Sequence, residues 1–351
     1  MAPVQNKTLI FKEIPTAAPV PGEHLVLEDR GFDPEAAPPQ GGLTLSILYA
    51  SFDPYMRGRM RPAHVESYVP AFELNGPVTS HCVACVIKSD TDAYQPGDLL
   101  VGMLPIGEYT VLDREGVKMI SRKVDTKYGL KDLGLFIGPL GMTGLTAWSA
   151  LYEIGQPKKG ETIFISSAAG AVGQVAGQIA KRQGLKVIGS VGSDDKLEFI
   201  INELGFDSGF NYKKEKPRDA LKRLAPEGLD IYYENVGGEQ LEAALDSMNN
   251  WGRIVVCGMI SQYNISEQDR YGVKNLFHVV SKRLTMRGFI VSDFADKYGK
   301  DHQERLSQWL VEGSVKAKLS VTDGMDNAID GLVGMLEGKN FGKAVLKIKD
   351  E

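Results

Sequence analysis

Residues 162–180 read TIFISSAAGAVGQVAGQIA, and this stretch decides the fold. Its apolar first part predicts a strand, and an amphipathic helix is predicted to begin directly after the turn AAGAVG at 168–173. In such a turn Gly170 lets the backbone approach a pyrophosphate, and Gly173 lets the helix pack onto the strand. The helix amino terminus adds amide donors and a positive dipole. Although Ala168 stands where the first glycine is usual, the position between strand and helix indicates dinucleotide binding.

Alternation of strands and helices continues from about residue 135 to 313. Apolar runs such as LKVIGSV (185–191), LDIYYEN (229–235) and GRIVVCG (252–258) are each followed or preceded by a helical period. Alternating strands and helices imply crossover connections and a parallel sheet. About six such strands are present, so the sequence predicts an α/β fold with a doubly wound, Rossmann-type sheet.

The first part of the chain has a different texture, rich in proline and glycine, with short β-like runs such as GGLTLSILYAS (41–51). It predicts an irregular β-barrel domain. The run FGKAVLKIKD (341–350) predicts one more strand, which we expect to return to the first domain. The predicted division is a substrate and catalytic domain over 1–131, a nucleotide-binding domain over 132–313 and a carboxyl-terminal return over 314–351.

Composition and charge exclude several classes of protein. The 351 residues are 43% hydrophobic and 24% charged, as in a globular protein, and the net charge of −5 offers no basic surface to nucleic acid or anionic lipid. No run of about 18 apolar residues predicts a membrane span, and the first residues do not resemble a signal peptide. Three cysteines are too few for a disulfide framework and fit a reducing compartment, so we expect a cytoplasmic protein.

The stretch TSHCVACVIK (79–88) contains a Cys-x-x-Cys spacing that is typical of metal ligands and redox thiols. Its β-branched and small residues favour a strand, in which Cys82 and Cys85 point to opposite faces. A structural zinc site needs a turn and four ligands, but Cys257 is about 170 residues away. We interpret the stretch as packing, with a reactive thiol as the lesser alternative, and predict no metal.

Selectivity between NAD and NADP is set where the second strand of such a fold ends. An NAD site usually carries an acid there to bind the ribose 2′-hydroxyl, but this chain has Gly192 and Ser193. Ser193 can donate to a 2′-phosphate, and Lys196 can neutralise it. Asp194 and Asp195 oppose this reading, but acids also suit the first turn of the following helix. The pattern predicts NADP.

Several stretches together resemble one known family. They occur in this order: DPYMRGRM (53–60), GMTGLTAW (141–148), AAGAVG (168–173), GSDDK (192–196), FNYK (210–213), ENVGG (234–238), CGMISQYN (257–264) and NFGKAV (340–345). They resemble the zinc-independent medium-chain dehydrogenase/reductases, and within them the branch of alkenal double-bond reductases, prostaglandin reductases and leukotriene hydroxydehydrogenases. The resemblance covers nearly the whole chain, and it implies a GroES-like barrel, a Rossmann domain and NADPH in the cleft between them.

The resemblance also implies a set of cofactor-binding residues. The segment matching Gly170 to Gly173 holds the pyrophosphate, and positions matching Lys196 and Tyr212 meet the 2′-phosphate side. The complete predicted set is Gly170, Ala171, Val172, Gly173, Gly192, Ser193, Lys196, Tyr212, Asn235, Cys257, Gly258, Met259, Ile260, Ser261, Gln262, Tyr263, Phe289, Ile290, Val291 and Asn340.

The first domain departs from this branch. It has TSHCVACV where relatives tend to be glycine-rich, and MLPIGEYT (103–110) where they often carry a tryptophan loop. Both stretches are candidates to border the pocket, so the substrate stays open. The zinc ligands of alcohol dehydrogenases have no counterpart either, because Ser51-Phe52-Asp53 and Leu74-Asn75-Gly76 stand in the comparable regions.

Reduction of a conjugated carbonyl at its β-carbon moves negative charge to the oxygen, so the enolate needs a hydrogen-bond donor and the α-carbon needs a proton. Tyr263 is the first candidate donor because it follows the fifth strand's carboxyl end, where such sheets bind ligands. A purely wall-forming Tyr263 is the alternative, and a ribose hydroxyl of the cofactor is another donor. Tyr55 is the second candidate, with shape and stacking favoured over proton chemistry. Arg57 and Arg59 are either solvated or attract an anionic substrate.

Three functions compete at this stage. The first is NADPH-dependent reduction of the double bond of enals and enones, the second is an alcohol or quinone oxidoreductase of the same superfamily, and the third is a non-catalytic NADPH-binding protein. Assembly is a further prediction. KRLTMRGFIV (282–291) supplies the sixth strand at a sheet edge, with the apolar residues Leu284, Met286 and Phe289, so we expect a homodimer that extends the sheet.

Overall fold

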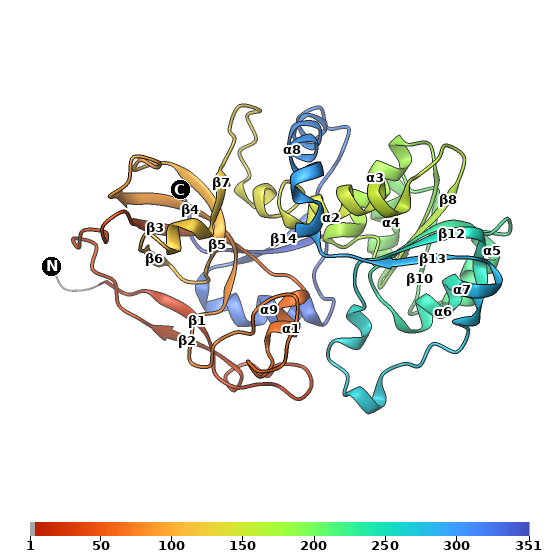
Figure 1. Ribbon diagram of the computed structural model, residues 1–351, viewed down its shortest axis with the longest axis horizontal. Helices are drawn as coiled ribbons and strands as arrows, with labels where there is room; N and C mark the ends of the chain where they lie inside the picture. Colours follow the sequence, from red (N-terminus) through yellow and green to blue (C-terminus); the bar gives the residue numbers. More distant parts are fainter. Residues whose placement is uncertain (1–3, 351) are drawn as a thin grey trace. The chain divides into compact units, whose positions relative to one another are not determined.

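The computed structural model describes residues 4–350, and the chain forms two compact units (Figure 1). The first unit takes in the chain up to Gly138 and again from Leu319 onward. The second unit is the continuous segment Pro139–Lys318. Within residues 4–350, every helix is too short or too polar to cross a membrane.

The second unit is built on a six-stranded parallel sheet in the order β10-β9-β8-β11-β12-β13. Its strands are β8 (Thr162–Ile165), β9 (Lys186–Val191), β10 (Ser208–Asn211), β11 (Leu229–Glu234), β12 (Met248–Val256) and β13 (Thr285–Gly288). Chain order reverses between β8 and β11, and open α/β sheets bind ligands at the carboxyl ends of the strands beside such a reversal. The predicted doubly wound sheet is therefore confirmed.

Helices cover both faces of this sheet, with α3 and α4 on one side and α5 and α6 on the other (Figure 1). The helices of the unit are α2 (Met142–Ala150), α3 (Ala171–Arg182), α4 (Asp194–Asn202), α5 (Pro217–Leu224), α6 (Gly238–Ser247), α7 (Phe277–Ser281) and α8 (Ala295–Val311), with short 3₁₀ segments η4 (Ile260–Gln262), η5 (Glu267–Asp269) and η6 (Val291–Phe294) and a π turn η3 (Leu151–Gly155). Shortly after α3 and α4, Gly184 and Gly205 adopt positive φ angles of 81° and 73°, as expected for left-handed helix ends.

The first unit is mostly β-structure. A seven-stranded sheet runs β14-β15-β3-β4-β5-β7 with β6 paired to β3, and β1 pairs with β2 separately. The elements are β1 (Lys7–Phe11), β2 (Leu25–Asp29), β3 (Leu43–Ser51), α1 (Tyr55–Arg59), β4 (Thr79–Ser89), β5 (Leu99–Pro105), β6 (Tyr109–Leu112), η1 (Gly116–Met119), β7 (Ile120–Lys123), η2 (Leu133–Ile137), β14 (Leu319–Asp323), η7 (Met325–Asn327), α9 (Ala328–Leu336) and β15 (Lys343–Lys347). The predicted fold class, a GroES-like β domain with a Rossmann domain, is confirmed.

The stretch with two cysteines is strand β4, as predicted. Cys82 is fully buried and Cys85 is partly exposed. Burial raises the pKa of the Cys82 thiol, which disfavours a reactive thiolate at that position. Among residues 4–350 no three His, Cys, Asp or Glu side chains cluster as a metal site would require. Metal-free chemistry stays a prediction.

The arginines of helix α1 hold neighbouring loops. Arg57 donates to the carbonyls of Pro15 and Ala17 at 3.2 and 2.7 Å. Arg59 donates to two other carbonyls, and its guanidinium lies 4.0 Å from the centre of the Phe72 ring. Both guanidinium groups therefore fix the backbone around α1, which disfavours the idea that they attract an anionic substrate.

Candidate functional site

The turn between β8 and α3 has no room for side chains at its glycines. A Cβ added to Gly173 would lie 2.4 Å from the Ser167 carbonyl oxygen and 2.8 Å from the Ala168 Cα. Ser167 itself adopts a φ of 52°, in the left-handed region that a non-glycine residue seldom occupies. The Gly170 amide donates to the Ser167 carbonyl at 2.9 Å, and Gly170 precedes the first residue of α3. The backbone of the turn therefore lies, without side chains at its two glycines, at the amino terminus of a 12-residue helix.

Ser166 ties the ends of two neighbouring strands together. Its hydroxyl accepts from the Asn235 amide at 2.9 Å, and the Asn235 side chain donates to the Ser166 carbonyl at 2.8 Å. The next loop is fixed to the same place, because the Ile260 amide donates to the Asn235 carbonyl at 3.2 Å. Ser261 donates from both its amide and its hydroxyl to the Val236 carbonyl. Loops that follow β8, β11 and β12 therefore meet at one edge of the sheet.

Glu234 holds the turn of the second of these loops, and sequence reasoning missed it. One carboxylate oxygen accepts from the amides of Val236 and Gly237 at 2.6 and 2.9 Å and from the Tyr232 hydroxyl at 2.8 Å. Burial raises the pKa of Glu234, while the two amides lower it. The other oxygen is buried without a hydrogen-bond partner among residues 4–350. An acid directly before Asn-Val-Gly-Gly was the available signal for this role.

Four predicted residues gather where β9 and β10 end. A Cβ on Gly192 would lie 3.1 Å from the Tyr212 hydroxyl, so these two residues are adjacent. Ser193 donates its hydroxyl proton to Asp195. Burial lowers the pKa of the nearby Lys196, with Asp195 opposing the shift.

The two acids that opposed an NADP site both have partners in the structure. Asp194 accepts from Asn211 at 2.9 Å and pairs with Lys214, and Asp195 accepts from Ser193. Asp194 and Asp195 also form the first turn of α4, as the sequence suggests. Helix and side-chain partners therefore explain the presence of both acids, and neither has to bind a ribose hydroxyl.

Tyr263 follows η4, and its ring folds back over its own loop. The phenol oxygen accepts from the Met259 amide at 3.1 Å, and a Cβ on Gly258 would lie 2.9 Å from it. Burial raises the pKa of Tyr263, so the phenol is neutral at pH 7. Because the amide uses only a lone pair of the oxygen, the phenol proton is left to be donated. The Tyr263 phenol is therefore protonated, and its proton is not used in the bond to Met259.

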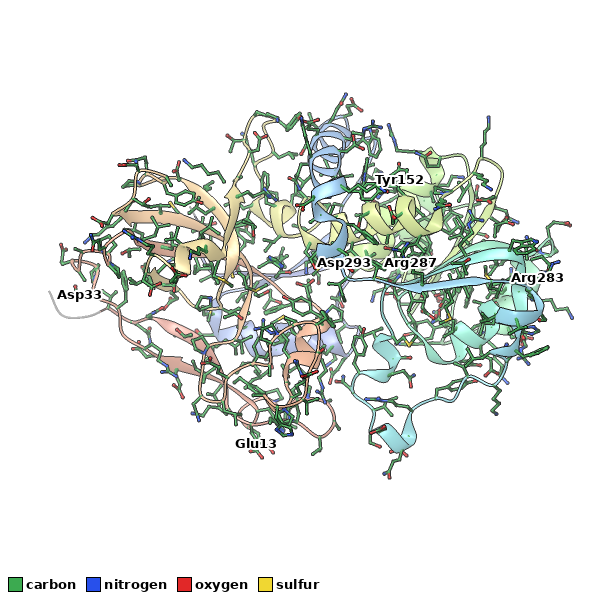
Figure 2. All side chains as sticks on the ribbon, viewed as in Figure 1. Glu13, Asp33, Tyr152, Arg283, Arg287 and Asp293 are labelled. Carbon is green, nitrogen blue, oxygen red and sulfur yellow. The ribbon has the colours of Figure 1, made fainter. Side chains whose placement is uncertain are left out.

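The other predicted residues lie elsewhere. Phe289, Ile290 and Val291 follow β13, and the Ile290 amide donates to Asp293 at 3.2 Å (Asp293 is labelled in Figure 2). Tyr55 and Asn340 belong to the first unit, where Asn340 donates to the Gly342 carbonyl at 2.7 Å. The structure thus brings together the predicted residues at the ends of β8 to β12, while Tyr55 and Asn340 come from the other unit.

Comparisons with known proteins agree with this architecture. The zinc-binding dehydrogenase family matches residues 171–310, and the family of N-terminal oxidoreductase domains matches residues 6–120. An NADP-dependent oxidoreductase of Cochliobolus heterostrophus is 53% identical over 99% of this chain and 98% of its own length. A 2-alkenal reductase (NADP(+)-dependent) of Nicotiana tabacum is 40% identical over 99% of both chains. The structure of CurA from Vibrio vulnificus in complex with NADPH superposes with a TM-score of 0.88, at 32% identity, over 98% of this chain and 100% of the other.

The residues of the second unit fit NADP. The backbone of Ser167 to Gly173 forms a cradle that a Cβ would fill, at a helix amino terminus suited to a pyrophosphate. Lys196 is the residue that could hold the 2′-phosphate, and Asn235 with the loop 257–263 could line the rest of the cofactor. The glycine turn, Lys196 and the loops after β11 and β12 lie at one edge of the sheet. Backbone amides and a lysine at that edge suit the phosphates of NADP, the cofactor of these relatives.

Proposed function

We propose that this chain, which belongs to the medium-chain dehydrogenase/reductase superfamily and to its zinc-independent, NADP-dependent alkenal reductase branch, reduces the carbon–carbon double bond of α,β-unsaturated aldehydes or ketones. The chain is an NADP-dependent oxidoreductase. When bound, NADPH supplies a hydride, which adds to the β-carbon of the substrate. The position of the Tyr263 phenol, held by the Met259 amide with its own proton left to donate, is the observation that carries the proposal.

In this proposal the chain's own residues stabilise the charge that forms on the substrate. As the β-carbon gains a hydride, negative charge grows on the carbonyl oxygen, and Tyr263 donates a hydrogen bond to it. Protonation of the α-carbon then completes a saturated aldehyde or ketone, so one proton is consumed for each double bond. Tyr55 contributes a ring against which the conjugated system stacks.

Product identification on a substrate panel tests this proposal. Purified protein is given NADPH with enals, enones, quinones and simple aldehydes, in buffer with EDTA, and the products are separated and identified. We expect saturated aldehydes and ketones from the enals and enones. Alcohols or hydroquinones as the main products would refute the proposal in favour of an alcohol or quinone oxidoreductase.

Replacement of Lys196 by alanine tests the NADP site. Removing the cation opposite the 2′-phosphate is expected to raise the KM for NADPH by about tenfold, the size of one charge-assisted contact. The KM for NADH, which lacks this phosphate, is expected to change little. Steady-state kinetics with both cofactors measure the effect, and Lys222→Ala, which removes an exposed lysine of α5, is the control. Equal losses with NADPH and NADH would contradict the assignment.

We also propose a homodimer, because the last strand of the second unit's sheet has no strand partner on its outer side within residues 4–350, and apolar side chains are exposed nearby. Strand β13 is the last strand of its sheet, and Arg283 and Arg287 lie towards its opposite ends (Figure 2). The sequence drew attention to Leu284, but that side chain turns inward and is only 8% exposed. The exposed apolar side chains in this region instead include Phe277 and Val280 of α7, which are 74% and 67% exposed. Unpaired edges and exposed apolar patches mark association surfaces.

A charge on this patch is expected to dissociate the dimer. Light scattering at micromolar concentration is expected to give twice the mass of one chain for the unchanged protein and the mass of one chain for Val280→Glu. The carboxylate would be desolvated in the interface, which is costly for an unpaired charge. Val321→Glu, at a 51% exposed position of β14, is the control and should leave the dimer intact. A monomer before any substitution would refute the proposal.

A further inference from the structure

The ladder between β3 and β15 ends in a pair of charged side chains. The two strands are antiparallel, with Ser51 opposite Val345. The Phe52 amide still donates to the Ala344 carbonyl at 3.2 Å, one position beyond β3. In the same register the next opposed residues are Asp53 and Lys343, and the Lys343 ammonium lies 2.8 Å from a carboxylate oxygen of Asp53.

This pair is buried and has further partners. The side chains of Lys343 and Asp53 are 1% and 2% exposed. Lys343 also donates to the Phe52 carbonyl at 2.7 Å, and the second oxygen of Asp53 accepts from the Ser51 hydroxyl. Burial lowers the pKa of Lys343, while Asp53 opposes the shift. Removing one member would therefore leave an uncompensated charge in the interior.

The chain leaves the sheet at this pair and turns directly into Tyr55. Lys343 donates to the Phe52 carbonyl, directly before this turn. Pro54 has a φ of −58° and precedes helix α1, whose first residue is Tyr55. The Met56 amide donates back to the Asp53 carbonyl at 3.0 Å, so the turn is closed on both sides of Tyr55. The Tyr55 ring is partly exposed and packs against the core of the first unit, and the turn that begins at Asp53 sets the backbone from which the ring projects.

We propose that Asp53 and Lys343 are positioning residues that fix the Tyr55 ring for stacking on the substrate, and so favour bulky conjugated enones over small enals. This inference rests on the proposed enone reduction. Stacking needs a ring at a defined distance and tilt, which a short helix cannot secure by itself. The ion pair at the end of the β3–β15 pairing can fix the ring position, because it joins the turn before Tyr55 to strand β15.

Kinetics on two substrates, in two backgrounds, test the inference. The paired variant carries both Asp53→Asn and Lys343→Met, so neither buried charge remains. It is compared with Lys343→Met alone. Both are made in the unchanged protein and in the Tyr55→Leu background. For an aryl enone we expect the paired variant to lower kcat/KM by about tenfold, and for a small enal by no more than about twofold. In Tyr55→Leu the paired variant should cost nothing further on the aryl enone. Lys12→Met, which removes a half-exposed ion pair of the same unit, is the control.

A measurement that needs no turnover accompanies the kinetics. Protein labelled with 3-fluorotyrosine is observed by fluorine NMR, with the Tyr55 resonance assigned through Tyr55→Phe. We expect one sharp Tyr55 resonance, and a shifted or broadened one in the paired variant. An unchanged resonance, or equal losses on both substrates in both backgrounds, would overturn the inference. A protein that reduces neither enone refutes the proposed function instead, and the resonance still decides whether the pair positions Tyr55.

Discussion

Replacing Gly173 with alanine is expected to weaken NADPH binding by about 100-fold, which corresponds to about 2.8 kcal/mol. The added Cβ would lie 2.4 Å from a backbone carbonyl oxygen and 2.8 Å from a backbone Cα, so no side-chain rotation relieves the clash. Helix α3 must move away from β8, and its amino terminus then no longer faces the pyrophosphate at hydrogen-bonding distance.

A matched glycine separates this clash from a general effect of alanine. Gly299 lies in helix α8, and a Cβ there would have no atom within 4 Å. Gly299→Ala is expected to leave NADPH affinity unchanged and to raise stability by about 0.5–1 kcal/mol through helix propensity. Fluorescence titration with NADPH and thermal unfolding measure both variants. Equal NADPH affinities for Gly173→Ala and the unchanged protein would show that the turn does not hold the cofactor.

The glycine turn between β8 and α3 could be predicted because its signals are contiguous. Strand, glycine turn and helix follow one another within 162–180, and each is specified by neighbours in the chain. Lys196 and Tyr212 could be proposed for a similar reason, since Lys196 lies in the first turn of the helix after β9 and Tyr212 directly follows β10, although Tyr212 needed the family resemblance as well. The sequence did not show that the Ser193 hydroxyl is turned to Asp195, because both side-chain directions suit the same backbone.

Contacts between distant parts of the chain could not be predicted. Ser166 meets Asn235 across 69 positions, and Lys343 meets Asp53 across 290. A serine just after a strand and a lysine at the start of another carry no sign of such partners in the sequence, because the register of the sheet decides which residues lie opposite one another. The direction of side chains at the edge of the second unit's sheet could not be predicted either. Leu284 lies next to β13 but turns into the core, and the exposed apolar side chains are carried by α7 instead.

Tyr263→Phe is expected to lower turnover on a small enone by about 10- to 100-fold while leaving NADPH affinity nearly unchanged. Loss of one donor to a developing oxyanion typically costs about 2.7–4 kcal/mol, or roughly 100- to 1000-fold, and a ribose hydroxyl that shares the charge reduces the loss. The ring is retained, so its packing over Gly258 persists and the loop 257–263, which we propose to line the cofactor, keeps its shape. The Met259 amide loses its acceptor, but a loop amide near the surface can be hydrated.

The wall-forming alternative for Tyr263 predicts the opposite pattern, with near-normal turnover and an altered KM for bulky enones only. Both constants are therefore measured on a small and a large enone, under conditions where a deuteride isotope effect shows that hydride transfer limits the rate. Tyr152→Phe is the matched control, because this half-buried tyrosine also loses a hydroxyl, which accepts from Gln183 at 3.0 Å (Tyr152 is labelled in Figure 2). It is expected to keep full turnover. If Tyr263→Phe matches it on the small enone, the enolate is stabilised by another donor and Tyr263 only shapes the pocket.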